Sequence, residues 1–274
     1  MKVALTGSEG MLGQDIQGVF SEDELIGFTY SSLDITVLDD VIRSIREARP
    51  DVLIHAAAYT DVDRAEAEPE QAYLVNGLGT RNLAMAAEEL RIPIVYLSTD
   101  YVFDGTKKAA YDEWDPACPV NQYGLSKLIG ERFVTSLTNR HYIVRTSWLC
   151  GKNGKNFVET ICRLLTERES LDVVDDQRGC PTFTSDLAVK LRELLGRGYG
   201  TYHITNSGAC SWYEFAVKIA GLKGYNKKIA PVTSDKFPRP AKRPANSVLG
   251  NTMLRLEGLE PLRPWEEALA DYLG

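Results

Sequence analysis

The sequence predicts an α/β protein in which a doubly wound parallel sheet is followed by a smaller C-terminal lobe. Two observations support this fold class. Short β-branched runs alternate with helix-period stretches through the first 148 residues, a pattern typical of βαβ units. After Trp148 the alternation loosens, and residues 226–264 hold six prolines, too many for a continuous helix or a central strand. The first part is therefore predicted to be a Rossmann-type fold and the last part a separate lobe.

Each element follows from its apolar spacing and its flanking residues. Strands are expected over 2–6, 24–30, 51–58, 92–99 and 141–148, and then over 171–175 and 201–205. The first helix carries its apolar residues at helical spacing, namely Leu12, Ile16, Val19 and Phe20. Further helices are expected over 37–48, 69–90, 156–169, 184–196, 211–221 and 264–273, with Pro69 at a favoured first-turn position. One more helix, which begins near Tyr123, lies between the strands at 92–99 and 141–148.

These elements divide the chain into two predicted parts. Residues 1–150 form a dinucleotide-binding Rossmann domain, to which residues 171–206 contribute strands and a helix. Residues 151–170 and 207–274 form a smaller substrate-binding lobe.

Composition excludes several classes of function. The net charge of -7 argues against a protein that binds nucleic acid, since such binding rests on clustered Lys and Arg. No apolar run approaches the roughly 20 residues that span a bilayer, and the N-terminus lacks the long apolar region of a signal peptide. We therefore expect a cytoplasmic protein that binds neither nucleic acid nor membrane. The five cysteines are widely spaced and are expected to be reduced thiols.

The stretch TGSEGMLG places Gly7, Gly10 and Gly13 between the first strand and the first helix. Glycine there allows a positive φ, lets the backbone approach a phosphate, and lets the helix pack closely on the strand. The helix N-terminus adds backbone donors and a partial positive charge. The spacing differs from G-x-G-x-x-G, and a plain tight turn is the alternative, but the position between strand and helix favours a cofactor pyrophosphate. Met11 and Leu12 belong to the same predicted site.

The choice between NADPH and NADH stays open in the sequence. An acid at the end of the second strand normally bonds the adenosine ribose and favours NAD. Here the positions Tyr30, Ser31 and Ser32 carry no acid, and no arginine is present for a 2′-phosphate. The nearest acid is Asp34, so Asp34 and its neighbour Ile35 are the candidate contacts.

Tyr123 and Lys127 stand four residues apart at the start of the helix that follows the fourth strand. On a helix this spacing puts both side chains on one face, with Cβ atoms roughly 5–6 Å apart. A free tyrosine titrates near 10, and an ammonium about 4 Å away lowers that pKa by roughly 3 units, which makes the phenol a usable acid. Chance supplies roughly 0.6 such pairs in this composition, so a solvated helix face is the alternative. The stretch STDYVFDG favours the catalytic interpretation, because it follows the fourth strand at the ligand-binding edge and offers the Thr99 hydroxyl there.

Together these motifs resemble the extended branch of the short-chain dehydrogenase/reductase superfamily. Within it, HAAAYTDVDRAEAEPE, LSTDYVFDG, YGLSKLIGE, VRTSWLCGKNGKNF, DQRGCPT and PRPAKRPANSVL are similar in order and spacing to the dTDP-4-dehydrorhamnose reductases. The resemblance covers nearly the whole chain and implies reduction of dTDP-4-dehydro-β-L-rhamnose to dTDP-L-rhamnose by NADPH or NADH. It implies that Tyr123 is the general acid, that Lys127 lowers its pKa and holds the nicotinamide ribose, and that Thr99 bonds the substrate carbonyl oxygen.

The same resemblance implies the residues around the reacting groups. Ala57, Ala58 and Tyr59 are expected to line the cofactor together with the glycines. The nucleotide-sugar substrate is expected to contact Tyr101, Trp148, Asn156 and Arg243, the last because a guanidinium suits a diphosphate. For Trp148 a buried core aromatic is the alternative.

Some relatives form dimers bridged by magnesium through acidic residues. Asp15 matches one such position, but Ser185 stands where a second acid is expected, so we predict no metal and keep a homodimer open. Asp61 and Asp63 are interpreted as a solvated turn. Two rival functions stay open: a non-catalytic, cofactor-binding regulatory subunit like the partner of methionine adenosyltransferase, and another sugar-nucleotide enzyme such as an epimerase. The stretch RTSWLCGKNGKNF favours the reductase over the regulatory subunit.

Overall fold

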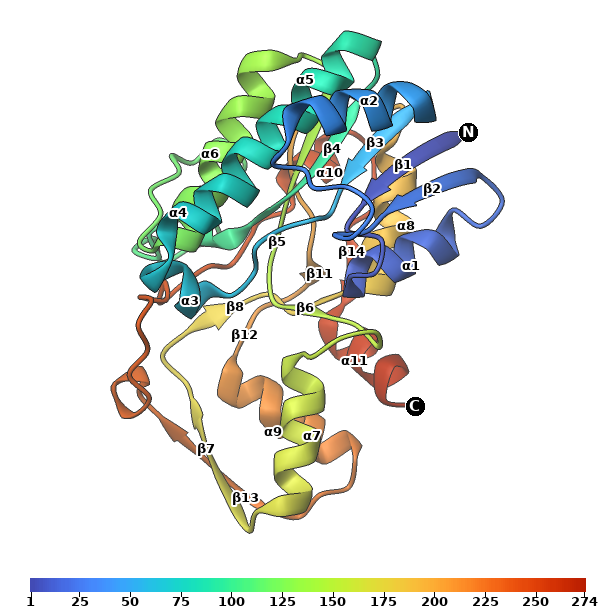
Figure 1. Ribbon diagram of the computed structural model, residues 1–274. Coiled ribbons are helices and arrows are strands. Elements are labelled where there is room, and N and C mark those ends of the chain that lie inside the picture. The colour runs from blue at the N-terminus through green and yellow to red at the C-terminus, as the bar shows by residue number, and fades with distance from the viewer.

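A computed structural model describes residues 1–274, and a six-stranded parallel sheet lies at its centre (Figure 1). Its strands are β1 (Lys2–Thr6), β2 (Glu24–Phe28), β3 (Val52–His55), β4 (Ile94–Thr99), β5 (His141–Thr146) and β10 (Gly200–His203). They run in the spatial order β2-β1-β3-β4-β5-β10, so the order reverses at β1, which has β2 on one side and β3 on the other. Ligands of open α/β sheets bind at such a switch point, beyond the carboxyl ends of the strands. The predicted fold class is confirmed.

Helices cover both faces of the sheet because successive strand residues point to opposite faces and both sets are apolar. Ala4, Leu53 and Tyr96 pack with one group of helices, α2 (Leu38–Ala48), α5 (Thr80–Leu90) and α6 (Gln122–Leu137). Val3 and Val95 pack with the other group, α1 (Met11–Val19), α8 (Thr184–Leu194) and the short α10 (Thr252–Leu256). Figure 1 shows α2, α5 and α6 on one side of the sheet and α1 and α8 on the other.

The segment 62–90 is more divided than the single helix expected over 69–90. It contains α3 (Val62–Ala67), α4 (Pro69–Ala72), the π-helix η1 (Tyr73–Gly79) and then α5. Two glycines bring it close to its neighbours: a Cβ added to Gly77 would lie 3.0 Å from Ile129, and one added to Gly79 would lie 2.7 Å from Ile35. π-Helical turns are rare in proteins, but many of those that occur are found at functional sites. This one holds Asn76 within hydrogen-bond distance of the loop after β3.

A second, smaller core lies below the sheet in Figure 1. It packs α7 (Phe157–Glu167), α9 (Trp212–Leu222) and α11 (Trp265–Leu273) with β7 (Ser170–Val174), which pairs with β13 (Lys228–Val232). β7 therefore lies outside the six-stranded sheet, so the strand expected over 171–175 does not contribute to the main sheet. The reason is that β7 buries only Leu171 and Val173, as a strand with one solvated face does. The other elements of residues 171–206, α8 and β10, do join the main fold. The domain boundaries as such stay a prediction.

Short strand pairs complete the fold and connect segments from both parts. These are β6 (Leu149–Cys150) with β9 (Thr182–Phe183), β8 (Arg178–Gly179) with β12 (Cys210–Ser211), and β11 (Asn206–Ser207) with β14 (Leu262–Pro264). Two 3-10 turns are η2 (Asp100–Val102) and η3 (Ser234–Lys236). The strands expected over 24–30, 51–58 and 141–148 end earlier, at Phe28, His55 and Thr146, because the chain beyond them turns into loops at the carboxyl edge of the sheet.

Candidate active site

The three glycines of the first turn meet at the switch point of the sheet. Gly7 has a φ of +74°, and a Cβ there would lie 2.6 Å from Ala57 N, so the turn after β1 packs directly on the chain after β3. A Cβ on Gly13 would lie 2.2 Å from Gly7 O, and Gly10 N donates to that same carbonyl at 3.0 Å. Side chains are therefore excluded from this glycine cradle, as close approach of a pyrophosphate requires.

The N-terminus of α1 adjoins the glycine cradle with its backbone donors uncapped. Gly10 is the N-cap residue, no side chain caps the helix, and no acid stands in its first turn. Such a helix end favours an anion through its unsatisfied N–H groups. Leu12 packs in the core, so its predicted cofactor contact is limited to its backbone, whereas the Met11 side chain lies against Gly151 in the loop after β6. The residues present fit a dinucleotide pyrophosphate.

Asp34 and Ile35, the candidates for the adenosine end, lie in the loop after β2. The Asp34 carboxylate is exposed and accepts from Thr36 N at 2.9 Å and from the Thr36 hydroxyl at 2.7 Å. Ile35 is buried and lies against Gly79. Asp34 is thus engaged by its own loop, through the backbone and side chain of Thr36.

Asn76 of η1 is a site residue that the sequence analysis did not identify. Its side chain is buried, its Oδ1 accepts from Tyr59 N at 2.8 Å, and its Nδ2 donates to Tyr59 O at 3.0 Å and to Ser126 Oγ at 2.9 Å. Asn76 thus fastens the loop that carries Ala57 and Ala58 to helix α6. The Tyr59 hydroxyl is buried without a hydrogen-bond partner, as expected of a group that meets a ligand. The available signal was a polar residue beside two helix-interior glycines in YLVNGLG.

Helix α6 presents both Tyr123 and Lys127 toward β4 and the turn that follows it. A Cβ on Gly124 would lie 2.1 Å from Tyr101 O, so the helix packs closely on that turn. The Tyr123 ring meets the Tyr101 ring edge-on, with ring centroids 5.9 Å apart. One helical turn later, Lys127 Nζ lies 4.3 Å from the centroid of the Tyr96 ring. The two side chains therefore lie on the same side of the helix, Lys127 against the middle of β4 and Tyr123 against the turn after it.

The electrostatics of this pair differ from the prediction. Burial raises the pKa of Tyr123 to about 12, the Asp100 carboxyl adds to the rise, and the facing Thr99 hydroxyl opposes it. Burial lowers the pKa of Lys127 to about 7, against the opposing effect of Glu131. Lys127 is not among the groups that shift the pKa of Tyr123, because a lysine whose own pKa has fallen to about 7 is already neutral where the phenol ionises. The predicted lowering of the Tyr123 pKa by Lys127 is therefore wrong for the chain on its own.

Thr99 ends β4, and its hydroxyl is engaged by its own turn. Thr99 Oγ1 donates to Asp100 Oδ1 at 3.0 Å and accepts from Tyr101 N at 3.2 Å. Thr99 and Asp100 are both buried, and the second carboxyl oxygen, Asp100 Oδ2, has no hydrogen-bond partner. Burial raises the pKa of Asp100 to about 7. Asp100 carried no signal in the sequence, because an aspartate at the start of a loop is usually solvated.

Arg243 ties the proline-rich segment to the Rossmann part. Its guanidinium forms an ion pair with Asp63 of α3 and donates to Ala241 O at 2.7 Å. Burial raises the pKa of Tyr101, and the neighbouring Arg243 opposes that rise. The expectation of a solvated turn holds for Asp61, which is exposed and caps α3, and is wrong for Asp63, which is the anion that holds Arg243.

Trp148 follows β5 in a left-handed backbone conformation, with a φ of +47°. Its ring is stacked on Trp212 of α9, with centroids 3.4 Å apart and an interplanar angle of 7°. A Cβ on Gly179 would lie 2.5 Å from Trp148 Cε2. A bulky residue in this conformation is strained, and such strain persists where surrounding contacts impose it, often at binding sites. Trp148 is also only half-buried, unlike a core aromatic.

Asn156 is the buried N-cap of α7. Its Oδ1 accepts from Glu159 N at 3.1 Å, and its Nδ2 donates to Gly151 O at 2.8 Å and to the Tyr272 hydroxyl at 3.1 Å. The amide therefore fastens the loop after β6 to α7 and α11, and its N–H groups are already used within the protein.

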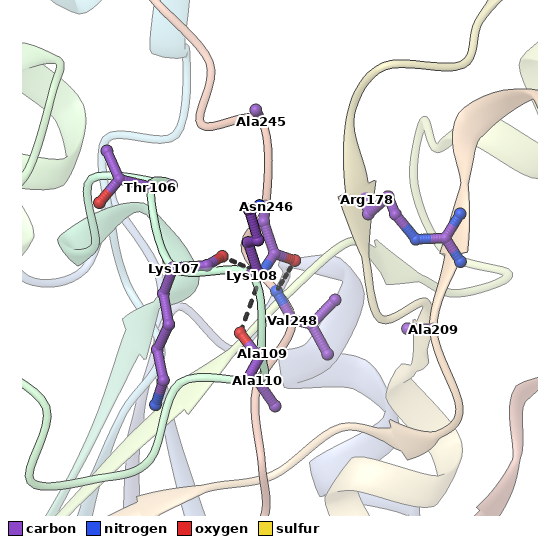
Figure 2. Close-up of a pocket in the computed structure, with 11 residues that line it drawn as sticks. Thr106, Lys107, Lys108, Ala109, Ala110, Arg178, Ala209, Ala245, Asn246 and Val248 are labelled. Atoms are coloured by element: carbon purple, nitrogen blue, oxygen red, sulfur yellow. Dashed lines mark hydrogen bonds between the residues drawn. The ribbon is translucent and has the colours of Figure 1, made fainter.

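A cavity of about 490 Å³ lies where the loop after β4, strand β8 and the proline-rich segment meet (Figure 2). Asn246 joins two of these segments by donating to Lys107 O at 2.7 Å and to Ala109 O at 2.9 Å. Arg178 stands apart on β8 in Figure 2. None of the predicted site residues lines this cavity, so it arises from loop packing and not from the candidate catalytic groups.

The chain brings together no group of three or more His, Cys, Asp or Glu side chains suited to a metal ion. None of its helices has both the length and the apolar character that a bilayer crossing needs.

Known proteins resemble this chain along its whole length. Residues 1–274 match the family described as RmlD substrate binding domain. The spore coat polysaccharide biosynthesis protein SpsK of Bacillus subtilis is 39% identical, over 99% of this chain and 96% of that protein. A dTDP-4-dehydrorhamnose reductase structure from Clostridium acetobutylicum has a TM-score of 0.97 at 44% identity, covering 100% of this chain and 98% of that one. Another from Bacillus anthracis, in complex with NADP, has a TM-score of 0.96 at 44% identity, covering 100% and 99%. The chain therefore belongs to the RmlD substrate binding domain family, and within it resembles the dTDP-4-dehydrorhamnose reductases.

Proposed function

We propose that the protein reduces the 4-keto group of dTDP-4-dehydro-β-L-rhamnose with NADPH or NADH, giving dTDP-L-rhamnose. One observation carries the proposal: the Tyr123 phenol and the Thr99 hydroxyl both adjoin Tyr101, in the turn at the carboxyl end of β4 and at the same sheet edge as the glycine cradle. A carbonyl oxygen bound between these hydroxyl groups would meet both a hydrogen-bond donor and an acid. The names of the similar reductases, and the NADP bound to one of them, support the substrate and the cofactor.

The bound nicotinamide supplies the hydride that adds to the carbonyl carbon. Tyr123 gives its phenolic proton to the oxygen as negative charge develops there, and the phenolate regains a proton from solvent afterwards. Thr99 stabilises the same oxygen by a hydrogen bond. The raised pKa keeps Tyr123 protonated at neutral pH, as a donor requires, so the phenolate needs a cation to stabilise it. Lys127 is the proposed cation.

The remaining site residues have proposed binding roles. Gly7, Gly10 and Gly13 with the α1 N-terminus would hold the pyrophosphate, and Lys127 would hold the nicotinamide ribose. The other proposed cofactor contacts are Met11, Leu12, Asp34, Ile35, Ala57, Ala58 and Tyr59. The sugar nucleotide would contact Tyr101, Trp148 and Arg243, with Asn156 contributing through the loop that it fastens. A homodimer, which the resemblance implies, and the cytoplasmic location expected from the sequence also belong to the proposal.

Purified protein should oxidise NADPH or NADH in step with the consumption of dTDP-4-dehydro-β-L-rhamnose, and not without it. Tyr123→Phe should lower kcat by roughly 10²–10⁴. Tyr199→Phe is the matched control, because Tyr199 is half-exposed beside the amino end of β10. Stoichiometric cofactor loss separates a reductase from an epimerase, which regenerates its cofactor, and from a regulatory subunit, which turns over none. A lack of cofactor oxidation with this substrate would disprove the proposal.

A further inference from the structure

The single proton of the Thr99 hydroxyl has two competing acceptors. In the structure Thr99 Oγ1 donates it to Asp100 Oδ1 at 3.0 Å, while Tyr101 N fills one of the two acceptor positions of the same oxygen at 3.2 Å. The proposed reaction asks Thr99 to donate to the substrate oxygen instead, and a threonine hydroxyl carries only one donor. As long as Asp100 is a carboxylate, it competes for the proton that the substrate needs.

The surroundings of Asp100 favour its neutral form. Asp100 is only 2% exposed, and its Oδ2 is buried with no hydrogen-bond partner. An ionised carboxylate with an unpaired oxygen is costly to bury, whereas the protonated acid gains a donor. The Ser247 hydroxyl faces the carboxyl and lowers the pKa of Asp100, but this effect is smaller than that of burial, and the same hydroxyl lies 3.4 Å from Arg178 O.

The groups that face Asp100 from the other elements include no cation to offset its charge. They are the phenols of Tyr101, on the same turn, and Tyr123, on α6, together with the Cys180 thiol and the Ser247 hydroxyl. The Arg243 guanidinium, which adjoins the Tyr101 phenol, is paired with Asp63 of α3. Burial therefore dominates, and it raises the pKa of Asp100 to about 7.

We propose that Asp100 works as a protonated acid that turns the Thr99 hydroxyl toward the substrate oxygen. With the proton on Asp100, its O–H donates to Thr99 Oγ1, and the Thr99 proton becomes available for the carbonyl oxygen. Thr99 Oγ1 then accepts from Asp100 and from Tyr101 N and donates to the substrate, so its hydrogen-bonding capacity is filled. Asp100 is a positioning residue, since it acts through Thr99. This inference rests on the proposed reductase function.

A neutral Asp100 also suits the developing charge of the reaction. A carboxylate beside the reacting oxygen would oppose the oxyanion that forms there, and it already adds to the raised pKa of Tyr123. Protonation of Asp100 removes the carboxylate charge that lies near both Tyr123 and the oxyanion. Proton donation by Tyr123 and formation of the oxyanion both become more favourable.

Asp100→Asn tests the inference, because an amide can donate to Thr99 at every pH. Wild-type kcat/KM for the 4-keto sugar should fall as Asp100 ionises with rising pH, and the variant should lack that part of the decline. The ratio of variant to wild-type kcat/KM should therefore rise roughly 10–30-fold between pH 6 and pH 8.5. The ratio cancels the effect of Lys127 titration on kcat/KM, because both proteins carry Lys127. Asp104→Asn, the same substitution four residues later, should show a constant ratio.

A ratio for Asp100→Asn that does not change with pH, or an equal loss of activity at all pH values, would overturn the inference. Ser247→Ala provides a second variant if Asp100→Asn folds poorly. The Ser247 hydroxyl lowers the pKa of Asp100, so its removal should move the alkaline decline of kcat/KM to higher pH. A decline that stays in place or moves to lower pH contradicts the inference.

The protonation of Asp100 can also be followed without turnover. Infrared difference spectra between wild type and Asp100→Asn should show the C=O stretch of a protonated carboxyl group at pH 6, lost as the pH rises through about 7. If that band titrates but no cofactor is oxidised, the proposed function fails while the protonated acid stands. If cofactor is oxidised but the band is missing at pH 6, the inference fails while the reductase stands.

Discussion

Lys127 holds its ammonium 4.3 Å from the centroid of the Tyr96 ring, and the Tyr96 hydroxyl donates to Lys127 O at 3.2 Å. A cation over an aromatic ring gains about 1–2 kcal/mol, which does not offset the burial of an unpaired ammonium. The pKa of Lys127 accordingly falls to about 7. The chain on its own therefore holds this lysine where its charge is unfavourable.

Lys127→Met should stabilise the protein while it removes most of the activity. Between about pH 7 and pH 10 the unfolded chain keeps the Lys127 proton and the folded chain loses it, so the free energy of unfolding rises with pH in that window. Below that window the folded chain carries the full cost of the charge. Urea denaturation at pH 6 without cofactor should show a gain of a few kcal/mol for Lys127→Met. The exposed Lys218→Met is the control, and a loss of stability for Lys127→Met would refute the argument.

Gly13→Ala should close the glycine cradle. Its methyl group would lie 2.2 Å from Gly7 O, a backbone atom that cannot move aside as a side chain can. Titration of protein fluorescence should show the Kd for NADPH raised roughly tenfold or more, which is at least about 1.4 kcal/mol. Gly18→Ala lies on the same helix with nothing within 4 Å of its added Cβ, so it should bind NADPH normally. Equal affinity for the two variants would exclude the cradle as the cofactor site.

Trp212→Ala should loosen Trp148 without touching the cofactor site. The variant removes the ring stacked at 3.4 Å, which helps to hold Trp148 in its strained conformation. Steady-state kinetics should show KM for the sugar nucleotide raised about tenfold, with the Kd for NADPH unchanged. Trp114→Ala, at a position 62% exposed, should leave both constants as they are. An unchanged KM for Trp212→Ala would argue that Trp148 does not contact the substrate.

Glu131→Gln should destabilise the fold, because it leaves the Arg145 guanidinium buried without its counter-charge. Arg145 NH2 donates to Glu131 Oε2 at 2.7 Å, and both side chains are less than 9% exposed. Breaking a buried pair in this way lowers the free energy of unfolding by roughly 3–5 kcal/mol. Glu89→Gln breaks the exposed pair with Arg46 and should cost at most about 1 kcal/mol. Urea denaturation of both variants at pH 7 measures the difference, and similar losses would refute it.

Local signals in the sequence were sufficient for the order of the elements and for much of the site. The period of the apolar residues distinguishes strand from helix, and the position of Gly7, Gly10 and Gly13 after the first strand locates the turn at the switch point. The spacing of Tyr123 and Lys127 places both on one side of α6, because residues four apart share a helix face. These features depend on neighbours in the chain, which a sequence displays directly.

The ends of strands and the π-helix were not predictable in the same way. The π-helix η1 arises where Gly77 and Gly79 let Ile129 and Ile35 approach the backbone, and those contacts come from other elements. Likewise, β7 leaves the main sheet because its partner is β13, almost 60 residues later in the chain. Pairings of this kind are chosen by tertiary packing.

The sequence by itself determined the fold class, the glycine-rich turn after the first strand and the tyrosine–lysine pair. Only the tertiary structure decided that Asn76 holds the loop of Tyr59, that Asp63 holds Arg243, and that Asp100 is buried beside Thr99. It also decided the charge of Lys127, since burial lowers a pKa that the sequence could only assume to be ordinary. The physical reason is that hydrogen-bond partners and solvation depend on which groups lie close in space, and distance along the chain does not specify them.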